Sequence, residues 1–180
     1  MKPANNKIIV KVNHSQKSSV NIAGSDFLLA KEYNHNRRES MPVVCEVVEG
    51  TGTLSKGTFL LVHHNRFSEN SPHHLEGNLY SLAYNTSIFA RLDKQGNPIG
   101  LCNNIIVDRV YENNSEFIPQ HLKKYDKHKN IVAGNGFGFK KGQVVFCFDL
   151  AAYEIIYVWN GEEKRVWKVV KSDVVGKINK

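Results

Sequence analysis

The sequence contains no apolar run long enough to cross a membrane as a helix. Its longest apolar stretches, such as residues 144–148 (VVFCF), fall far short of the about 20 residues that such a helix needs. The N-terminus also lacks the apolar run and the cleavage site of a signal peptide, because polar residues lead directly into an alternating pattern. We therefore expect a cytoplasmic protein with no membrane partner.

Cysteine is scarce, and the number of cysteines is odd. The three residues, Cys45, Cys102 and Cys147, are widely spaced along the chain. This argues against a disulfide framework. Cys45 and Cys147 lie within apolar, strand-like runs, where a reduced thiol behaves as a small buried hydrophobic group.

Motifs of the common enzyme classes are missing too. No Walker, GxSxG or HExxH pattern occurs, and the glycine-rich stretch Gly134–Gly138 leads into a strand pattern rather than a helix. The paired histidines, His63-His64 and His73-His74, have no cysteine or carboxylate at a ligand-like spacing, and neighbours on a strand face opposite sides. We expect solvated surface histidines, no bound metal, no cofactor and no enzymatic activity.

The chain is basic, with a formal net charge of +7. Its lysines are dispersed in small clusters, and no stretch alternates arginines with aromatic residues as a nucleic-acid platform does. The sequence thus favours a solvated basic surface, and nucleic acid is not an expected partner.

No segment keeps a helical period of 3.6 residues over twelve or more positions. Short β-rich runs separated by glycine and asparagine turns are present instead, and Asn160-Gly161 between two such runs is a strong hairpin signal. The pattern predicts an all-β chain folded as a barrel or a sandwich.

Two long polar segments interrupt the strands, and each contains a short apolar island. In residues 13–40 the island is Phe27, Leu28 and Leu29, and in residues 112–129 it is Phe117 and Ile118. Such segments are too long and polar for ordinary connections, so they are functional or disordered. Packing of the first island as an ordinary strand, and anchoring of the loop by the second, remain alternative interpretations.

The same order of turn residues occurs twice in the chain. Residues 47–62 contain VVEGTG and then KGTFLLV, and residues 131–148 contain IVAGNG and then GQVVFCF after Lys141. Each stretch predicts a strand, a Gly-x-Gly turn, a Lys-Gly turn and another strand, and each follows a long polar segment. This self-similarity indicates a duplication.

The order of these elements resembles the GroES co-chaperonin family. The second half is the most similar, with GNG at 134–136, KKGQVVF at 140–146, and residues 160–178 where the family has a closing hairpin and a terminal strand. The first half is similar through IIVKV at 8–12 and GTG at 50–52. Residues 92–110 would close this half, and the polar residues 65–78 would be an insert.

The resemblance implies a GroES-like small barrel, duplicated or enlarged, with long mobile loops. Residues 1–110 would form one unit with a mobile loop at 13–40. Residues 104–180 would form a second unit, with residues 105–110 as a strand that both units can share.

The resemblance also implies a function without catalytic residues. A co-chaperonin caps a GroEL-like chaperonin ring and assists ATP-dependent folding of an unfolded client protein. The chaperonin-binding residues implied here are Phe27, Leu28, Leu29, Phe117 and Ile118. A non-enzymatic structural or assembly protein, such as a shell component built from a GroES-like barrel, is the alternative.

Small barrels of this pattern leave terminal strands open, and residues 8–12 and 174–178 are the strands that we expect at the edges. Unpaired edges favour pairing with a neighbouring chain. We therefore expect a closed homo-oligomer in the form of a ring.

Overall fold

The protein folds almost entirely into β-strands. The computed structural model describes residues 7–12, 19–22, 25–28, 44–52, 54–63, 66–67, 71–85, 87–111, 124–148 and 152–178. No α-helix occurs among these residues, and η5 (Lys171–Asp173) is a short 3₁₀ turn. The prediction of an all-β chain is confirmed, but the described strands form two large antiparallel sheets and no closed barrel.

The first sheet is antiparallel and has seven strands. In spatial order they are β6 (His74–Glu76), β7 (Leu79–Ala83), β1 (Lys7–Lys11), β4 (Val44–Glu49), β5 (Phe59–Val62), β8 (Ile88–Leu92) and β9 (Pro98–Gly100).

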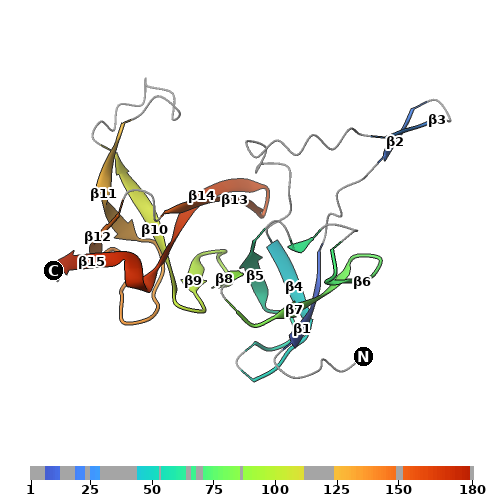
Figure 1. Ribbon diagram of the computed structural model, residues 1–180, viewed down its shortest axis with the longest axis horizontal. Helices are drawn as coiled ribbons and strands as arrows, with labels where there is room; N and C mark the ends of the chain where they lie inside the picture. Colours follow the sequence, from blue (N-terminus) through green and yellow to red (C-terminus); the bar gives the residue numbers. More distant parts are fainter. Residues whose placement is uncertain are drawn as a thin grey trace.

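The second sheet is antiparallel and has six strands. Their order is β13 (Tyr153–Trp159), β14 (Glu162–Val170), β10 (Asn104–Tyr111), β11 (Tyr125–Val132), β12 (Val144–Cys147) and β15 (Val174–Ile178). A separate hairpin joins β2 (Ser19–Ile22) to β3 (Ser25–Leu28). Figure 1 shows this hairpin standing apart from the two large sheets, which lie side by side.

The two large sheets have the same strand order. Replacing β6-β7-β1-β4-β5-β8 by β13-β14-β10-β11-β12-β15 reproduces every pairing, and all of these pairings are antiparallel. We call β1 and β4–β8 the first unit, and β10–β15 the second unit. One register shift is also shared, because β5–β8 shifts between Leu61 and Val62 where β12–β15 shifts between Phe146 and Cys147. The duplication inferred from the sequence is therefore present in the fold.

The Lys-Gly turns are equivalent in the two units, but the Gly-x-Gly turns are not. Gly57 and Gly142 both have a φ of +82°, and their N–H groups donate to the carbonyls of Val47 and Val132, each at 2.8 Å. Counting back from these turns makes Val47 the counterpart of Val132, whereas the sequence comparison made it the counterpart of Ile131. The sequence comparison was wrong by one residue because it aligned the glycines of the Gly-x-Gly turns. The feature that the two units share is the backbone hydrogen bond of the Lys-Gly turn.

Each unit has its own apolar core, made of side chains from equivalent positions. The first core contains Ile8, Val10, Val47, Leu60, Val62 and Leu82. The second contains their counterparts, Ile105, Val107, Val132, Val145, Cys147 and Val169. These side chains are all nearly or fully buried, so each unit supplies its own hydrophobic stabilisation.

The structure corrects two expectations about the first unit. Its closing hairpin is β6–β7, the counterpart of β13–β14, and not residues 92–110; the polar segment 65–78 therefore contains part of the repeat. Residues 8–12 do not form an edge, because β1 lies between β7 and β4. An apolar strand such as β1 is more stable in the centre of a sheet, with a neighbour on both sides, than at the edge of the sheet. The expectation for residues 174–178 is confirmed, since β15 is the last strand of its sheet.

The predicted hairpin at Asn160-Gly161 is also confirmed. Both residues have positive φ, +52° and +84°, as a two-residue turn that matches the twist of its strands requires. Seven pairs then run from Tyr153↔Lys168 to Trp159↔Glu162. This long hairpin reaches from the second unit towards the first (Figure 1).

Within the part of the chain that the structure describes, no helix combines the length and the hydropathy that a membrane span needs.

The close approach of the two sheets predicts unequal effects of two glycine substitutions. A Cβ on Gly134 would lie 1.6 Å from the Pro98 carbonyl oxygen, while one on Gly136 would meet nothing closer than 3.4 Å. We expect Gly134→Ala to lower the free energy of unfolding by about 1–3 kcal/mol through overpacking, and Gly136→Ala to change it little. Urea unfolding of both variants measures this, and a Gly134→Ala variant as stable as the parent would contradict the packing described.

Candidate functional site

The first long polar segment connects β1 to β4. The structure places Phe27 and Leu28 on β3, where they pair with Val20 and Ser19 of β2. These two strands form a sheet of their own. Leu29 lies outside the described residues, and the binding role of the three-residue island remains a prediction.

Residues 125–129 of the second long polar segment belong to β11, and the rest of the segment connects β10 to β11, so it occupies the same place in the second unit. Phe117 and Ile118 lie outside the described residues, and their role also remains a prediction. The strands on either side are held together where they begin to diverge. The Arg109 guanidinium lies 4.5 Å from the centre of the Tyr125 ring, and its Nη1 donates to the Lys127 carbonyl at 3.4 Å.

The start of β11 is further fixed by Asp126. Its Oδ1 accepts hydrogen bonds from the backbone N–H groups of His128 and Lys129, both at 2.9 Å. These bonds, from Lys129 first and then His128, lower the pKa of the Asp126 carboxyl, because they stabilise its charged form. A carboxylate that caps two backbone donors defines where the segment ends and the strand begins.

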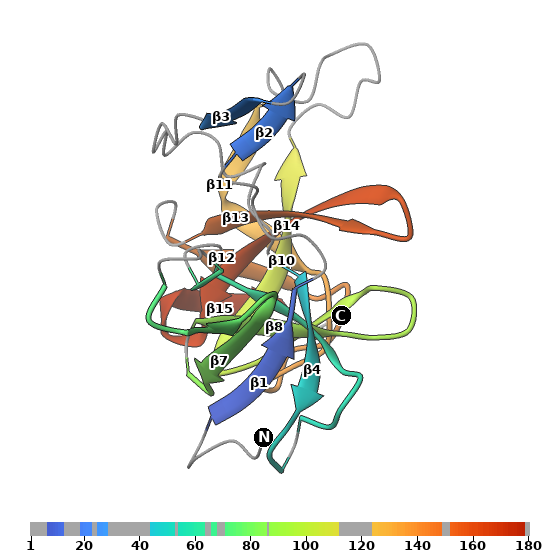
Figure 2. The same cartoon turned by 90° about the vertical axis from the view of Figure 1, so that its right-hand side faces the viewer.

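The strands that precede the two long segments, β1 and β10, end on the same side of the molecule. In the view of Figure 1 and in the perpendicular view of Figure 2, β1 and β10 run upwards, and β4 and β11 run back down. The β2–β3 hairpin lies at this upper end in both views. The repeat therefore places the ends of β1 and β10 on one side of the protein.

A shared apolar cluster fixes the two units relative to each other. We call it the interface cluster, and its members from both units are almost completely buried. The first unit contributes Leu61, Phe89, Ala90 and Leu92, and the second contributes Ile106, Ala133, Ile155, Tyr157 and Val166. Phe59 and Trp159 extend it with an edge-on ring contact, their centroids 5.0 Å apart.

Hydrogen bonds across the interface add direction to this contact. The Tyr157 hydroxyl donates to the Gly96 carbonyl at 2.9 Å, and the Lys164 ammonium donates to the Gln95 carbonyl at 2.9 Å. Asp93 shapes the receiving turn, since its carboxylate accepts from the backbone N–H groups of Gln95 and Asn97 at 2.9 and 2.7 Å. The β8–β9 turn is thus built to meet the β13–β14 hairpin.

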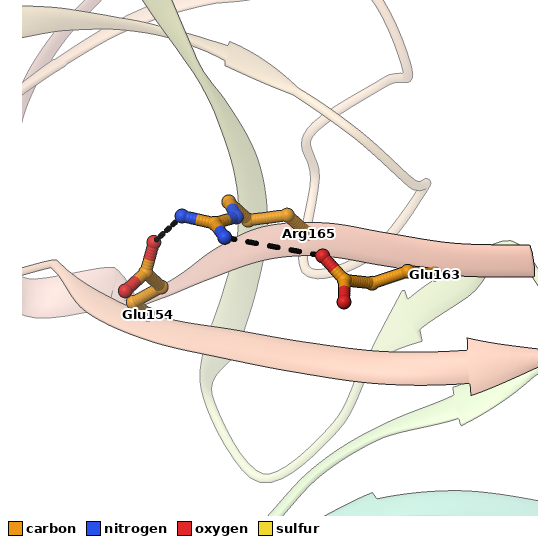
Figure 3. A network of polar contacts seen from close by, with 3 residues as sticks. All are labelled: Glu154, Glu163 and Arg165. Atoms are coloured by element: carbon orange, nitrogen blue, oxygen red, sulfur yellow. Dashed lines mark hydrogen bonds and ion pairs between the residues drawn. The ribbon is translucent and has the colours of Figure 1, made fainter. Parts of the chain in front are cut away.

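A small charge network lies on the β13–β14 hairpin, as Figure 3 shows. Arg165 contacts Glu154 at 3.0 Å and Glu163 at 3.9 Å, with side chains between 29% and 63% exposed. Ion pairs this exposed contribute about 1 kcal/mol or less. The network therefore supports the hairpin modestly.

The histidines differ from the solvated side chains that the sequence predicted. His63 stacks on Tyr153 with ring centroids 5.4 Å apart, and Arg66 Nη1 lies 2.7 Å from His73 Nε2. The guanidinium can only donate, so the Nε2 atom of His73 accepts this bond. Partial burial, and then the charge of Arg66, lowers the pKa of His73. His63, His73 and His74 are therefore half-buried and in contact with neighbouring side chains, while His64 lies outside the described residues.

No group of three or more His, Cys, Asp or Glu side chains suited to a metal ion occurs among the described residues. Cys45 and Cys147 are buried free thiols, as predicted, and Cys102 is a half-buried free thiol. Burial raises the pKa of Cys147 to about 11, which keeps this thiol protonated at neutral pH.

Sequence reasoning did not identify the residues that orient the two units. Tyr157 and Gly96 are far apart in the chain, and a tyrosine in an apolar strand gives no sign of its partner. A usable signal existed for Gly134, because a Gly-x-Gly turn permits close backbone approach.

The Tyr157 hydrogen bond gives a prediction with a defined pH dependence. Burial, with the charges of Asp108 and Asp93, raises the pKa of Tyr157 from 10.0 to about 12. The folded protein therefore holds this proton more tightly than the unfolded chain. The resulting stability is complete below pH 10 and is lost as the pH rises towards 12.

We expect Tyr157→Phe to lower the free energy of unfolding at pH 7 by about 1 kcal/mol, because the Gly96 carbonyl loses its donor. Between pH 10 and 12 the variant should lose less stability than the parent, since phenylalanine has no hydroxyl that can ionise. Chemical unfolding of parent and variant across this range measures both effects, and parallel pH profiles would contradict the assignment.

Comparison with known proteins gives no relative from which a function could be transferred, as no protein-family model, no curated protein and no solved structure matches this chain.

Proposed function

We propose that this protein is a co-chaperonin, built from two GroES-like units in one chain, which caps a chaperonin ring. The observation that carries this proposal is the common direction of β1 and β10, the strands that precede the two long polar segments. Each is the first strand of its unit, and both end towards one side of the molecule (Figures 1 and 2). A cap must present its binding segments on one face, and a rigid duplication provides that arrangement.

The apolar islands supply the contact in this account. Phe27, Leu28 and Leu29 in the first segment, and Phe117 and Ile118 in the second, insert between apolar helices of the chaperonin. Each fully sheltered side chain contributes about 1.5–3 kcal/mol. Ordering a segment costs about 1–2 kcal/mol per residue, so one segment alone binds weakly.

Multivalency restores the affinity. Two segments on one rigid chain, repeated around a homo-oligomeric ring, convert later binding events into intramolecular ones. The interface cluster is what makes the pair rigid, because it fixes both units in one orientation. The client protein is then enclosed in the capped chamber of the cytoplasmic chaperonin, and the cap itself needs no catalytic residue.

The proposal predicts that the islands matter for binding and not for folding. We expect Leu28→Ala to weaken ATP-dependent binding to a GroEL-type chaperonin at least tenfold, because a multivalent contact loses one anchor at every copy. Leu75→Ala is the matched control, since Leu75 is a 40% exposed leucine on β6, outside both segments. Co-sedimentation with the chaperonin in the presence of ATP measures binding, and thermal unfolding measures stability.

Three outcomes would count against the proposal. The parent could fail to bind in any nucleotide state, as a structural subunit would. Leu28→Ala could bind like the parent, or it could unfold at a much lower temperature, which would make Leu28 a core residue. Phe117→Ala repeats the test in the second segment, where we expect a loss of the same kind.

A further inference from the structure

The second unit exposes an apolar surface on β12 and β15. Phe148, Val175 and Ile178 are 60%, 64% and 47% exposed, and they lie beside the half-buried Val144 and Phe146. We call these five residues the β15 face. A cluster of exposed large apolar side chains on one sheet is typical of an interaction site.

The repeat shows how the same positions are used in the first unit. Leu92 pairs with Phe59 on β8–β5, as Ile178 pairs with Val144 on β15–β12. By the same comparison, Phe89 is the counterpart of Val175, because each is the unpaired residue at the register shift of its strand. Phe89 and Leu92 are only 3% and 7% exposed, since they belong to the interface cluster and the second unit covers them.

The strand edges differ in the same way. In the first unit β9 pairs with the outer side of β8, from Ala90↔Gly100 to Leu92↔Pro98. Among the described strands, β15 has a neighbour on its inner side and none on its outer side. The second unit therefore shows both the apolar side chains and the open edge that the first unit has covered.

We propose that the β15 face binds the first unit of a second copy of this chain, and that this contact repeats the one between the two units within the chain. The covering residues within the chain include Ile106, Ala133 and Val166. Their counterparts on the first unit are Ile9, Val48 and Leu79, on β1, β4 and β7. These three counterparts are apolar, although Ile9 is only 5% exposed within its own chain. Ile155, which also belongs to the interface cluster, has the charged Glu76 as its counterpart, so the chemistry of the internal contact is preserved in part.

Such a contact joins two different faces, so it is heterologous. Each molecule offers a β15 face at one end and a first unit at the other, and molecules add head to tail. Repetition of the same step gives a ring when the rotation closes, and a filament when it does not. The contact rests on the repeat alone, whereas closure into a ring deepens the proposed function, because a cap must encircle the chamber.

A charge on the β15 face tests the contact. We expect the parent to sediment as an oligomer at micromolar concentration. The Val175→Asp variant should sediment as a monomer. The matched control is Val158→Asp, because Val158 is 61% exposed on β13, outside the β15 face. Thermal unfolding of both variants shows whether the fold is intact. A monomeric parent, or a Val175→Asp oligomer like that of the parent, would overturn the proposal.

Cross-linking tests the geometry. Within the chain, the Lys168 ammonium lies 5.5 Å from the centre of the Phe89 ring. The equivalent pair between chains is Ser81 with Val175. In a Cys102→Ser background, we expect a chain with Val175→Cys and a chain with Ser81→Cys to be joined by a short bifunctional maleimide when mixed. Joining of either chain to itself with equal yield would contradict a head-to-tail contact.

Chaperonin binding by the same samples separates this inference from the proposed function. An oligomer that depends on Val175 but binds no chaperonin supports the contact and removes the function. A parent that binds the chaperonin while Val175→Asp assembles normally supports the function and removes the contact.

Discussion

The arrangement of this protein depends on the apolar contact between its two units. Leu61, Phe89 and Leu92 on one side, and Ile106, Tyr157 and Val166 on the other, exclude water from the junction. Each unit has a core of its own, so the contact is not what folds them. It fixes their relative orientation, and thereby determines that β1 and β10 end on the same side of the molecule.

Duplication explains why one contact can serve twice. A surface that evolved to cover its neighbour is present in both units, yet a linear chain can satisfy it only once internally. The β8 side of the first unit is covered, while the β15 side of the second remains exposed and apolar. Exposed apolar area is costly in a monomer, and association with another copy removes that cost. The proposed assembly would then follow from the repeat itself.

The sequence predicted the all-β class, the hairpin at Asn160-Gly161 and the duplication, because alternation and turn residues are local signals. The sequence comparison aligned the Gly-x-Gly turns wrongly by one residue. Backbone hydrogen bonds, such as that from the Gly142 N–H to the Val132 carbonyl, cannot be read from the types of residue involved. The sequence also placed β1 at an edge, because strand order depends on partners distant in sequence. Tyr157 and Gly96 could not be paired for the same reason.

The most direct test of the central claim is hydrogen exchange of the full chain, with and without a GroEL-type chaperonin and ATP. We expect backbone amides in residues 13–40 and 112–123 to gain protection together, because both segments bind one target from one side. Amides in the interface cluster should be unchanged, since that contact is already formed in the free protein. Protection in neither segment, or in the sheet faces alone, would contradict the account.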